Sequence, residues 1–252
     1  MTATHQLEDT LRRLKLFGML DTLAARLAQA QAGELGHAEL LGVLLADEAS
    51  RRDATGLERR VKAARFEQLT TIEEFDFSFN PKIPAPQIRD LATLRFVEAG
   101  ESVILHGPVG VGKSMIAQAL GHQACRRGYS VAFTKASRLL SDLAGGHADR
   151  SFETRLTRWA RPSVLILDDF AMRDFTLAQS DDLYELITAR VDRPVLFTAN
   201  RAASDWYSLF PNPVVAESIL DRIVNSAHHV HMDGKSYRPN KRPGQPAKAK
   251  AR

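Results

Sequence analysis

The sequence predicts an α/β fold, with a parallel five-stranded sheet and crossover helices, preceded by a small all-helical domain. Three observations indicate this. From residue 102 onward, short apolar segments alternate with helical ones, as expected for strands joined by crossover helices. A glycine-rich sequence joins the first apolar segment to the first of these helices. Before residue 70, in contrast, apolar side chains recur at helical spacing.

Residues 1–70 are expected to form helices that bind DNA or support assembly. Their apolar residues recur at intervals of three to five, as one apolar helix face requires, at Leu7, Leu11, Leu14, Met19, Leu23 and Leu27. Between residues 51 and 65 there are six bases and two acids. Arg52, Arg59 and Lys62 are spaced by seven and three, so they share a helix face. This stripe could contact nucleic-acid phosphates, although the solvated face of a small bundle explains the same residues.

Residues 71–90 are expected to be a linker. Phe75, Phe77 and Phe79 alternate there, and prolines at 81, 84 and 86 then interrupt any helix. The linker is expected to dock these aromatic side chains on the next domain. A helix over residues 87–99 should follow.

The core domain is expected to span residues 91–234. Its strands are predicted at 102–106, 131–133, 164–167, 195–198 and 229–232. The third strand is apolar on both faces, as a central buried strand should be. The longer segment 135–160 should contain two helical stretches separated by Gly145 and Gly146.

The segment after the first strand matches the phosphate-binding motif G-x-x-x-x-G-K-[ST] without a mismatch. Its glycines let the backbone wrap closely around an anion, and the following helix adds the positive end of its dipole. Lys113 is expected to reach the β- and γ-phosphates, and the Ser114 hydroxyl to ligate Mg²⁺. A glycine-rich turn without nucleotide is the alternative. The expected nucleotide-binding residues are Gly107, Pro108, Val109, Gly110, Val111, Gly112, Lys113, Ser114 and Met115.

Polar side chains end the third and fourth strands. Asp168, 54 residues beyond Ser114, is expected on the metal side of the site, acting through water. Asp169 is the candidate to orient and deprotonate the attacking water. Asn200 could hydrogen-bond the γ-phosphate or that water. A polar turn would explain the two acids, and asparagine is also common at the start of a loop.

Two downstream arginines, Arg222 and Arg238, could stabilise transition-state charge, in the same subunit or in a neighbouring one. Ordinary surface roles fit their spacing equally well. The histidines His228, His229 and His231 lie on a predicted strand, but no cysteine or further histidine lies nearby, so a metal site there is not expected.

Composition indicates a cytoplasmic protein without membrane contact. The chain has one cysteine, Cys125, no signal peptide, and no apolar run of 18 residues. Its net charge of +4 becomes −3 for residues 1–234, because residues 235–252 hold seven bases and no acid. This basic tail is expected to be disordered. It could attract nucleic-acid phosphates or serve only solubility.

Several of these segments together resemble one family, the IstB-like transposition helper ATPases. They are the phosphate loop, Phe-Asp-Phe-Ser-Phe at 75–79, Leu-Asp-Asp at 167–169, Thr-Ala-Asn at 198–200, Asp-Arg at 221–222 and Ser-Tyr-Arg at 236–238. The family belongs to the AAA+ class and is related to bacterial helicase loaders and replication initiators. The resemblance covers residues 7–239. Many NTPases share the loop, whereas the linker and the Ser-Tyr-Arg ending are far more specific.

The resemblance implies a three-layer αβα domain, ATP rather than GTP as ligand, and subunits that assemble around DNA with ATP between them. By matching position, Asn200 is the expected first sensor, Arg238 a second-sensor-like residue, and Arg222 an arginine finger that acts on a neighbour's ATP. The segment after the second strand corresponds to a DNA-facing helix in this family. Lys135 and Arg138 are therefore candidates for contact with the DNA backbone.

The sequence departs from many AAA+ ATPases at Asp169, where they carry glutamate. The side chain is one methylene shorter, so it reaches less far toward the attacking water. Slow hydrolysis would suit a switch whose working state is the ATP-bound one.

The expected function is that of an ATPase, slow and stimulated by DNA, which oligomerises on duplex DNA and assists a transposase in target selection and insertion. A replicative helicase loader is the nearest alternative. A DNA-binding scaffold that uses ATP only to assemble, with negligible hydrolysis, is an alternative of another class. A small-molecule kinase has little support, because no arginine-rich lid follows the third strand.

Overall fold

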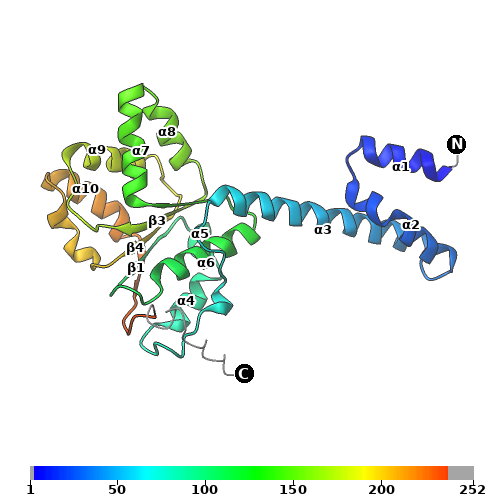
Figure 1. Ribbon diagram of the computed structural model, residues 1–252, viewed down its shortest axis with the longest axis horizontal. Helices are drawn as coiled ribbons and strands as arrows, with labels where there is room; N and C mark the ends of the chain where they lie inside the picture. Colours follow the sequence, from blue (N-terminus) through cyan, green and yellow to red (C-terminus); the bar gives the residue numbers. More distant parts are fainter. Residues whose placement is uncertain (1–2, 238–252) are drawn as a thin grey trace, which may run out of the picture. The chain divides into compact units, whose positions relative to one another are not determined.

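A five-stranded parallel sheet forms the centre of the larger unit of the chain (Figure 1). The structure, a computed structural model, describes residues 3–237. The strand order is β2-β3-β4-β1-β5, and every pairing is parallel, which confirms the predicted sheet. The strands are β1 (Ser102–His106), β2 (Val131–Lys135), β3 (Val164–Phe170), β4 (Val195–Ala199) and β5 (Ala227–His231).

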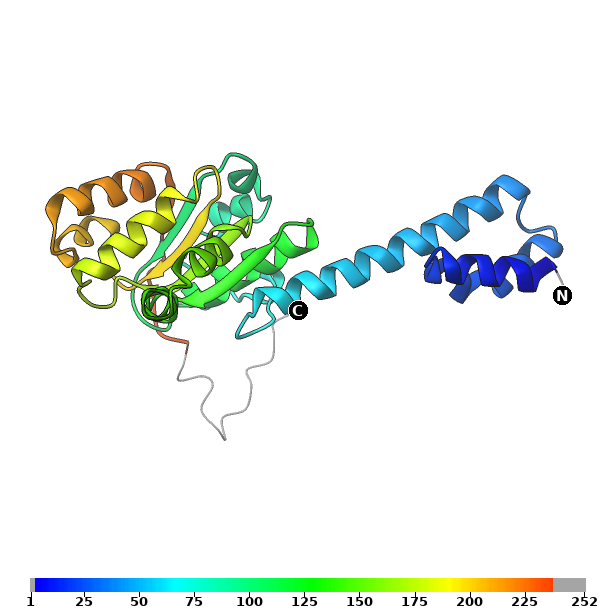
Figure 2. The same cartoon turned by 90° about the horizontal axis from the view of Figure 1, so that it is seen from above.

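Helices cover both faces of the sheet, which confirms the three-layer arrangement (Figures 1 and 2). On one face, α6 contacts the first four strands. On the other, α7 and α10 lie against the sheet with α9 packed between them. The helices of this unit are α4 (Ala85–Leu91), α5 (Arg95–Glu98), α6 (Lys113–Arg126), α7 (Ala136–Asp149), α8 (Phe152–Ala160), α9 (Leu177–Thr188) and α10 (Pro213–Val224), with 3₁₀ turns η1 (Ile72–Glu74), η2 (Ala203–Asp205) and η3 (Tyr207–Leu209).

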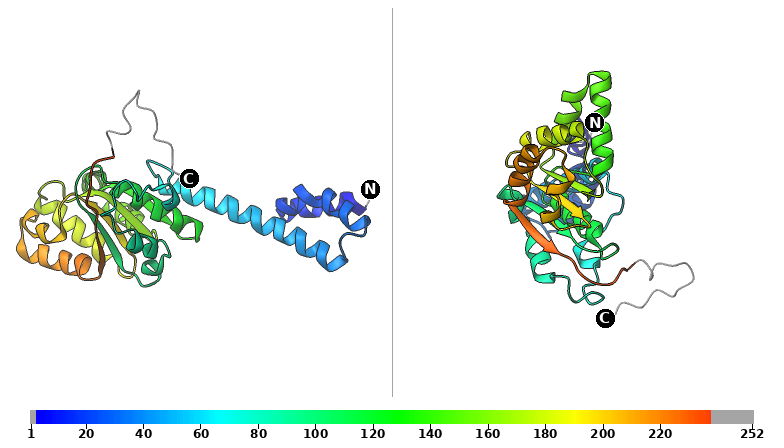
Figure 3. Two further views of the ribbon diagram at one scale, coloured as in Figure 1. Left: turned by 90° about the horizontal axis from the view of Figure 1, so that it is seen from below. Right: turned by 90° about the vertical axis from the view of Figure 1, so that its left-hand side faces the viewer.

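The strand order places a topological switch point between β1 and β4. The connection through α6 runs from β1 past β4 and β3 to β2, whereas the later connections run the opposite way over the other face. β5 is the edge strand on the other side of β1 (Figure 3). Ligands of open α/β sheets bind beyond the carboxyl ends of strands at such a point. Because His106 pairs with Ala199, the chain leaves both strands there side by side.

An aromatic cluster anchors the carboxyl end of β3. Phe170 packs edge-on against Phe197 and Trp206, with ring centroids 4.8 Å away in both cases. All three side chains are fully buried. Their packing holds the strand immediately after the two acidic residues 168 and 169.

Two parts of the secondary structure differ from the prediction. The single helix expected over 87–99 is split into α4 and α5, because Leu94 takes a left-handed conformation (φ 68°) with its side chain buried. Gly145 and Gly146 lie inside α7 rather than between two helices. A Cβ atom on Gly146 would lie 2.8 Å from the Cα atom of Phe152, so this glycine allows α8 to pack closely against α7. The break itself falls at Arg150 (φ 61°).

The smaller unit ends at Arg59 and is entirely helical over its described residues, as expected. Its helices are α1 (Ala3–Arg13), α2 (Phe17–Gln31) and the first part of α3 (His37–Ala64). Leu11, Met19, Leu23 and Leu44 form the core. Leu7 and Leu14 are exposed, because the chain breaks after α1 and does not continue the single apolar face that the spacing suggested.

Glu48 fixes the start of α2 within this smaller unit. Its carboxylate accepts hydrogen bonds from the Gly18 backbone N–H and from Arg52 Nε, both at 2.6 Å. Burial raises the pKa of Glu48, but the bonds from Arg52, Gly18 and Met19 outweigh this and leave it below its usual value.

Over residues 3–237, no helix combines the length and the apolar character needed to cross a membrane.

Arg190 ties the turn after α9 to the body of the larger unit. Only 4% of the residue is exposed, and burial, followed by the charge of Arg193, lowers its pKa to about 9, so it is still charged at neutral pH. Its guanidinium donates to four backbone carbonyl oxygens at 2.9–3.0 Å, those of Trp159, Ala160, Pro162 and Pro194.

Replacing Arg190 with alanine should lower the free energy of unfolding by about 3 kcal/mol or more, because buried carbonyl oxygens lose their donors. The matched control is Arg193→Ala. Arg193 is exposed and donates to Ala160 O at 3.1 Å, so its loss should cost about 1 kcal/mol or less. Urea unfolding measures both. Equal losses would show that Arg190 does not anchor the turn.

Candidate functional site

The glycine-rich loop between β1 and α6 is packed closely by distant parts of the chain. Gly110 (φ 84°) and Gly112 (φ 103°) take left-handed conformations. A Cβ atom on Gly110 would lie 2.1 Å from Ser236 Oγ, and one on Gly112 would lie 2.5 Å from Phe75 Cε2. Only glycine fits at these positions. The loop leads into the N-terminus of α6, where the helix dipole favours an anion.

Lys113 is the first residue of α6, and its side chain extends back toward the start of the loop. Its side chain is buried, and its ammonium group donates to the carbonyl oxygens of Gly107 and Pro108, both at 2.7 Å. Ser114 follows in the first turn of α6. Gln118 donates to Ser114 O at 3.2 Å. The loop lysine and serine are therefore held on a fixed backbone.

The two acids lie within β3 at a β-bulge. Leu167 pairs with Phe197 and Phe170 with Ala199, so two residues of β3 face one residue of β4. That residue is Thr198. Its hydroxyl donates to Asp168 Oδ1 at 2.6 Å and accepts from the Asp169 backbone N–H at 3.0 Å.

The bulge gives the two acids different surroundings. Asp168 is 3% exposed. Asp169 takes a left-handed conformation (φ 54°), which aspartate tolerates better than most residues, and lines the cleft described below. One carboxylate is therefore fixed in the protein and its neighbour is presented to a ligand.

A lysine lies beside Asp169. Lys135 Nζ, at the end of β2, is 3.8 Å from Asp169 Oδ2 and 3.7 Å from Glu67 Oε1. Burial, and then the charge of Asp168, raise the pKa of Asp169, while Lys135 and Lys113 oppose the shift. The net increase in basicity suits a group that accepts a proton.

A cleft of about 500 Å³ joins these groups. On one side are the loop and the start of α6, and on the other are Asp169, Met172 and Asn200, whose Nδ2 lies 3.1 Å from Met172 Sδ. The remaining wall comes from the linker and the end of the described chain, through Gln68, Glu74, Phe75, Asp76, Phe79, Asn80 and Tyr237.

The linker and residues 233–237 form that wall as one unit. Asn80 exchanges two hydrogen bonds of 2.9 Å with the backbone of Lys235. The rings of Phe79 and Tyr237 meet edge to face, with centroids 4.8 Å apart. The Tyr237 N–H donates to Gly110 O at 2.9 Å, which attaches the wall directly to the loop.

The structure brings together part of the predicted site. Residues 109–115, Asp169 and Asn200 line one cleft, and Asp168 lies behind it. Arg222 lies toward the amino ends of the strands, because β5 begins opposite Ser102. Its guanidinium donates to Ser218 O at 3.1 Å and lies 5.3 Å from the Tyr184 ring centroid.

The predicted DNA-contacting residues lie on several elements. Arg52, Arg59 and Lys62 are exposed on α3, and Arg138 is exposed on α7. Lys135 is half-buried beside Asp169. Arg238 and the rest of the tail, residues 239–252, lie outside the described residues.

Sequence reasoning did not include Thr198, Asn80 or Tyr237 in the site. The role of Thr198 depends on the register between β3 and β4, for which the sequence carries no signal. Alternation of the three linker phenylalanines did indicate docking, but not on which surface. Asn80 and Lys235 are 155 residues apart, so only the folded chain shows their pairing.

Known proteins resemble this chain over almost its whole length. The family model described as IstB-like ATP binding protein matches residues 9–244. A Mycobacterium tuberculosis protein, named as an ATP-binding protein in an insertion sequence, is 59% identical over 95% of this chain and 96% of its own length. A Pseudomonas aeruginosa protein, named as an ATP-binding protein of insertion sequence IS21, is 35% identical over 93% of this chain and 89% of its own.

Solved structures agree with the fold. DnaI superposes with a TM-score of 0.57 at 21% identity, over 65% of this chain and 91% of DnaI. The DnaC helicase loader gives a TM-score of 0.54 at 18% identity, over 69% of this chain and 99% of DnaC. The likeness is one of fold, an α/β domain built on a parallel sheet.

Gly112→Ala should weaken ATP binding about tenfold to a hundredfold, because strain of about 1–3 kcal/mol and the clash with Phe75 must distort the loop or the linker. Gly128→Ala is the matched control. Gly128 is also left-handed (φ 94°), but nothing lies within 4 Å of the added Cβ atom. Isothermal titration with ATP measures both. An unchanged affinity of Gly112→Ala would contradict a close fit of loop and linker.

Proposed function

Because the chain belongs to the IstB-like ATP-binding family, we propose that it is a transposition helper ATPase, which assembles on duplex DNA and assists a transposase. The observation that carries the proposal is the single cleft shared by the glycine-rich loop, Asp169 and Asn200. The names of two relatives place them in insertion sequences, the genetic setting of transposition.

The residues present fit ATP and Mg²⁺. The loop backbone lines the cleft, where it can contact phosphates, and the cleft has the volume of a nucleotide site. Lys113 would bind the β- and γ-phosphates. The Ser114 hydroxyl, and Asp168 through water, would hold Mg²⁺, which prefers oxygen ligands. Bound there, the metal supplies positive charge that stabilises the charge developing on the phosphates.

Hydrolysis would depend on Asp169 and Asn200. Asp169 has the raised pKa and the exposure to the cleft that a general base requires. Asn200 would orient the water or the γ-phosphate. The short side chain of Asp169, together with its contact to Lys135, supports slow turnover.

Arg222 would act on the ATP of a neighbouring subunit. It lies toward the opposite end of the sheet from its own loop, so a role in its own site is not supported. A second copy of the chain could bring it to the cleft in the manner of an arginine finger. Arg238 is proposed as a second-sensor-like residue on the resemblance alone.

DNA contact is proposed for Arg52, Arg59 and Lys62 on α3 and for Lys135 and Arg138 near the end of β2. Such contacts would be mainly to phosphates, so binding should be weakly selective for sequence and should fall as salt rises. The protein would act in the cytoplasm, where ATP and DNA are both present.

Two other functions have a specific observation in their favour. The fold shared with DnaI and DnaC fits a helicase loader, the same ATPase with a different client. The Lys135–Asp169 pair fits a scaffold with negligible hydrolysis, because it neutralises the candidate base. ATPase assays with and without duplex DNA separate the scaffold from the helper.

Mixing Lys113→Ala and Arg222→Ala subunits should restore ATPase activity that each variant lacks alone. In a 1:1 mixture, roughly a quarter of all interfaces then join an intact loop of one variant to an intact Arg222 of the other. Each variant alone should lose about a thousandfold in kcat. Phosphate release is measured with and without duplex DNA.

The control for this mixture is Lys113→Ala with the double variant Lys113→Ala/Arg222→Ala, which should stay inactive. Parental activity of Arg222→Ala alone would remove the arginine from catalysis. Turnover of the parent that does not respond to DNA would favour the scaffold.

Lys135→Met should shift the acid limb of the ATPase pH profile to higher pH. A base must be deprotonated to act, so activity falls as the pH drops through the pKa of Asp169. Lys135 lowers that pKa, and its removal raises it further. The profile is measured at saturating ATP without DNA. The control Arg138→Met removes a nearby basic side chain and should leave the acid limb of the profile unchanged. If the acid limb of Lys135→Met is also unchanged, Asp169 is not the base.

A further inference from the structure

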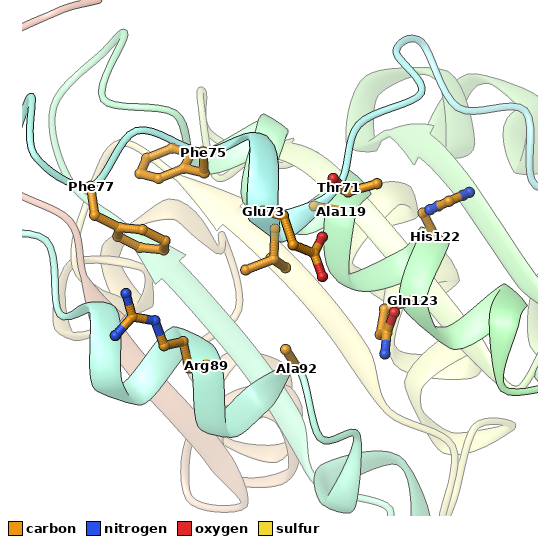
Figure 4. A pocket seen from close by; sticks show the side chains of 10 residues that line it. Thr71, Glu73, Phe75, Phe77, Arg89, Ala92, Ala119, His122 and Gln123 are labelled. Carbon is orange, nitrogen blue, oxygen red and sulfur yellow. The ribbon is translucent and has the colours of Figure 1, made fainter. Parts of the chain in front are cut away.

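A second pocket, of about 420 Å³, lies beside the nucleotide cleft (Figure 4). It is formed by the linker, α4 and α6, and we call it the Phe77 pocket. The two cavities share Phe75, whose ring stands 4.8 Å from that of Phe77. A displacement of the Phe75 ring therefore changes the shape of both cavities.

The Phe77 pocket combines an apolar surface with one charge of each sign. Phe75, Phe77 and Ala92 provide apolar wall, and Figure 4 shows Glu73 and Arg89 on separate elements around the same space. The Arg89 guanidinium lies 5.5 Å from the Phe77 ring centroid. Bonds from its own backbone N–H and from Thr71 hold the pKa of Glu73 below its usual value, so it stays anionic. A short apolar side chain flanked by an acid and a base would fit.

The turn after α9 carries such a sequence on its surface. Val191 is 68% exposed, and the exposed residues Asp192 and Arg193 follow it. We call these three residues the Val191 turn. Arg190 anchors it to four carbonyl groups, and Asp192 is left-handed (φ 58°). The turn is therefore held in shape before it meets a partner, which lowers the entropy cost of docking.

The Val191 turn and Arg222 belong to the same surface. Both line one cavity of about 550 Å³ near the amino ends of the strands. The proposed function has Arg222 enter the nucleotide cleft of a second copy. The Val191 turn would then contact the surface of that copy next to the same cleft. The Phe77 pocket is the cavity next to that cleft.

We propose that the Phe77 pocket receives Val191 from a second copy of this chain. Asp192 would then pair with Arg89, and Arg193 with Glu73. The inference rests on the proposed function, because it uses the assembly that brings Arg222 to a neighbour's ATP. It adds a second contact point, and through Phe75 and Gly112 it connects subunit docking to the phosphate loop.

Cysteine cross-linking tests the contact. Ala92→Cys in the pocket and Val191→Cys in the turn are small changes, and a disulfide forms only when the Cα atoms approach to about 4.4–6.8 Å. The native Cys125 is buried, and burial raises its pKa to about 11, so it should not react. The double variant is oxidised with ATP and duplex DNA and analysed on a non-reducing gel. A ladder of covalent multimers is expected.

The control pairs Ala92→Cys with Val214→Cys. Val214 is 71% exposed, but it lies at the start of α10 and has no charged neighbours in sequence. It should give less than about a tenth of the multimers, because its Cα atom would not come within disulfide reach. Equal cross-linking of both pairs, or none for Val191 while sedimentation shows oligomers, overturns the docking and leaves the proposed function intact. If the parent protein forms no oligomer with ATP and DNA, both the docking contact and the proposed function are wrong.

A charge exchange gives an independent measurement. Glu73→Lys and Arg193→Glu should each raise the protein concentration at half-maximal assembly about tenfold, because like charges then meet. The double variant restores an opposite pair and should return to within about threefold of the parent. Additive losses in the double variant would exclude this pairing.

Discussion

Close packing around the phosphate loop is the constraint on which the rest of the site depends. Ser236 lies against Gly110 and Phe75 against Gly112, at distances that leave no space for a side chain. The loop therefore has its shape only when the linker and the end of the described chain are in place. ATP affinity and the position of these distant segments are in this way parts of one arrangement, and a change in either affects the other.

The acidic edge of the site is built in a complementary way, from strand register. In a regular strand, consecutive side chains point to opposite faces. The bulge at residues 168 and 169 lets Thr198 hold both at once, so Asp168 is fixed inside and Asp169 is presented to the cleft. The aromatic packing of Phe170 against Phe197 and Trp206 holds the strand just after this bulge. Lys135 lies beside Asp169 and lowers the pKa of this carboxylate.

Much of this could be predicted from sequence, because its signals are local. Apolar runs identified the five strands, and the glycine-rich motif identified the loop. What could not be predicted depends on contacts between distant residues. The bulge follows from how β3 pairs with β4. Asn80 meets Lys235 only after folding. Gly146 suggested a break, yet it serves the close approach of α8 to α7. Leu94 is left-handed and its side chain is buried, and no local pattern indicates this break in the helix.

Phe75 forms a wall of two cavities that differ in chemistry, one able to take phosphates and the other an apolar side chain. A small molecule that filled the Phe77 pocket would press on this ring and, through it, on Gly112. It would inhibit without competing with ATP for the loop. Such an inhibitor would act through a surface that lies outside the nucleotide site, the part that phosphate-loop enzymes have in common.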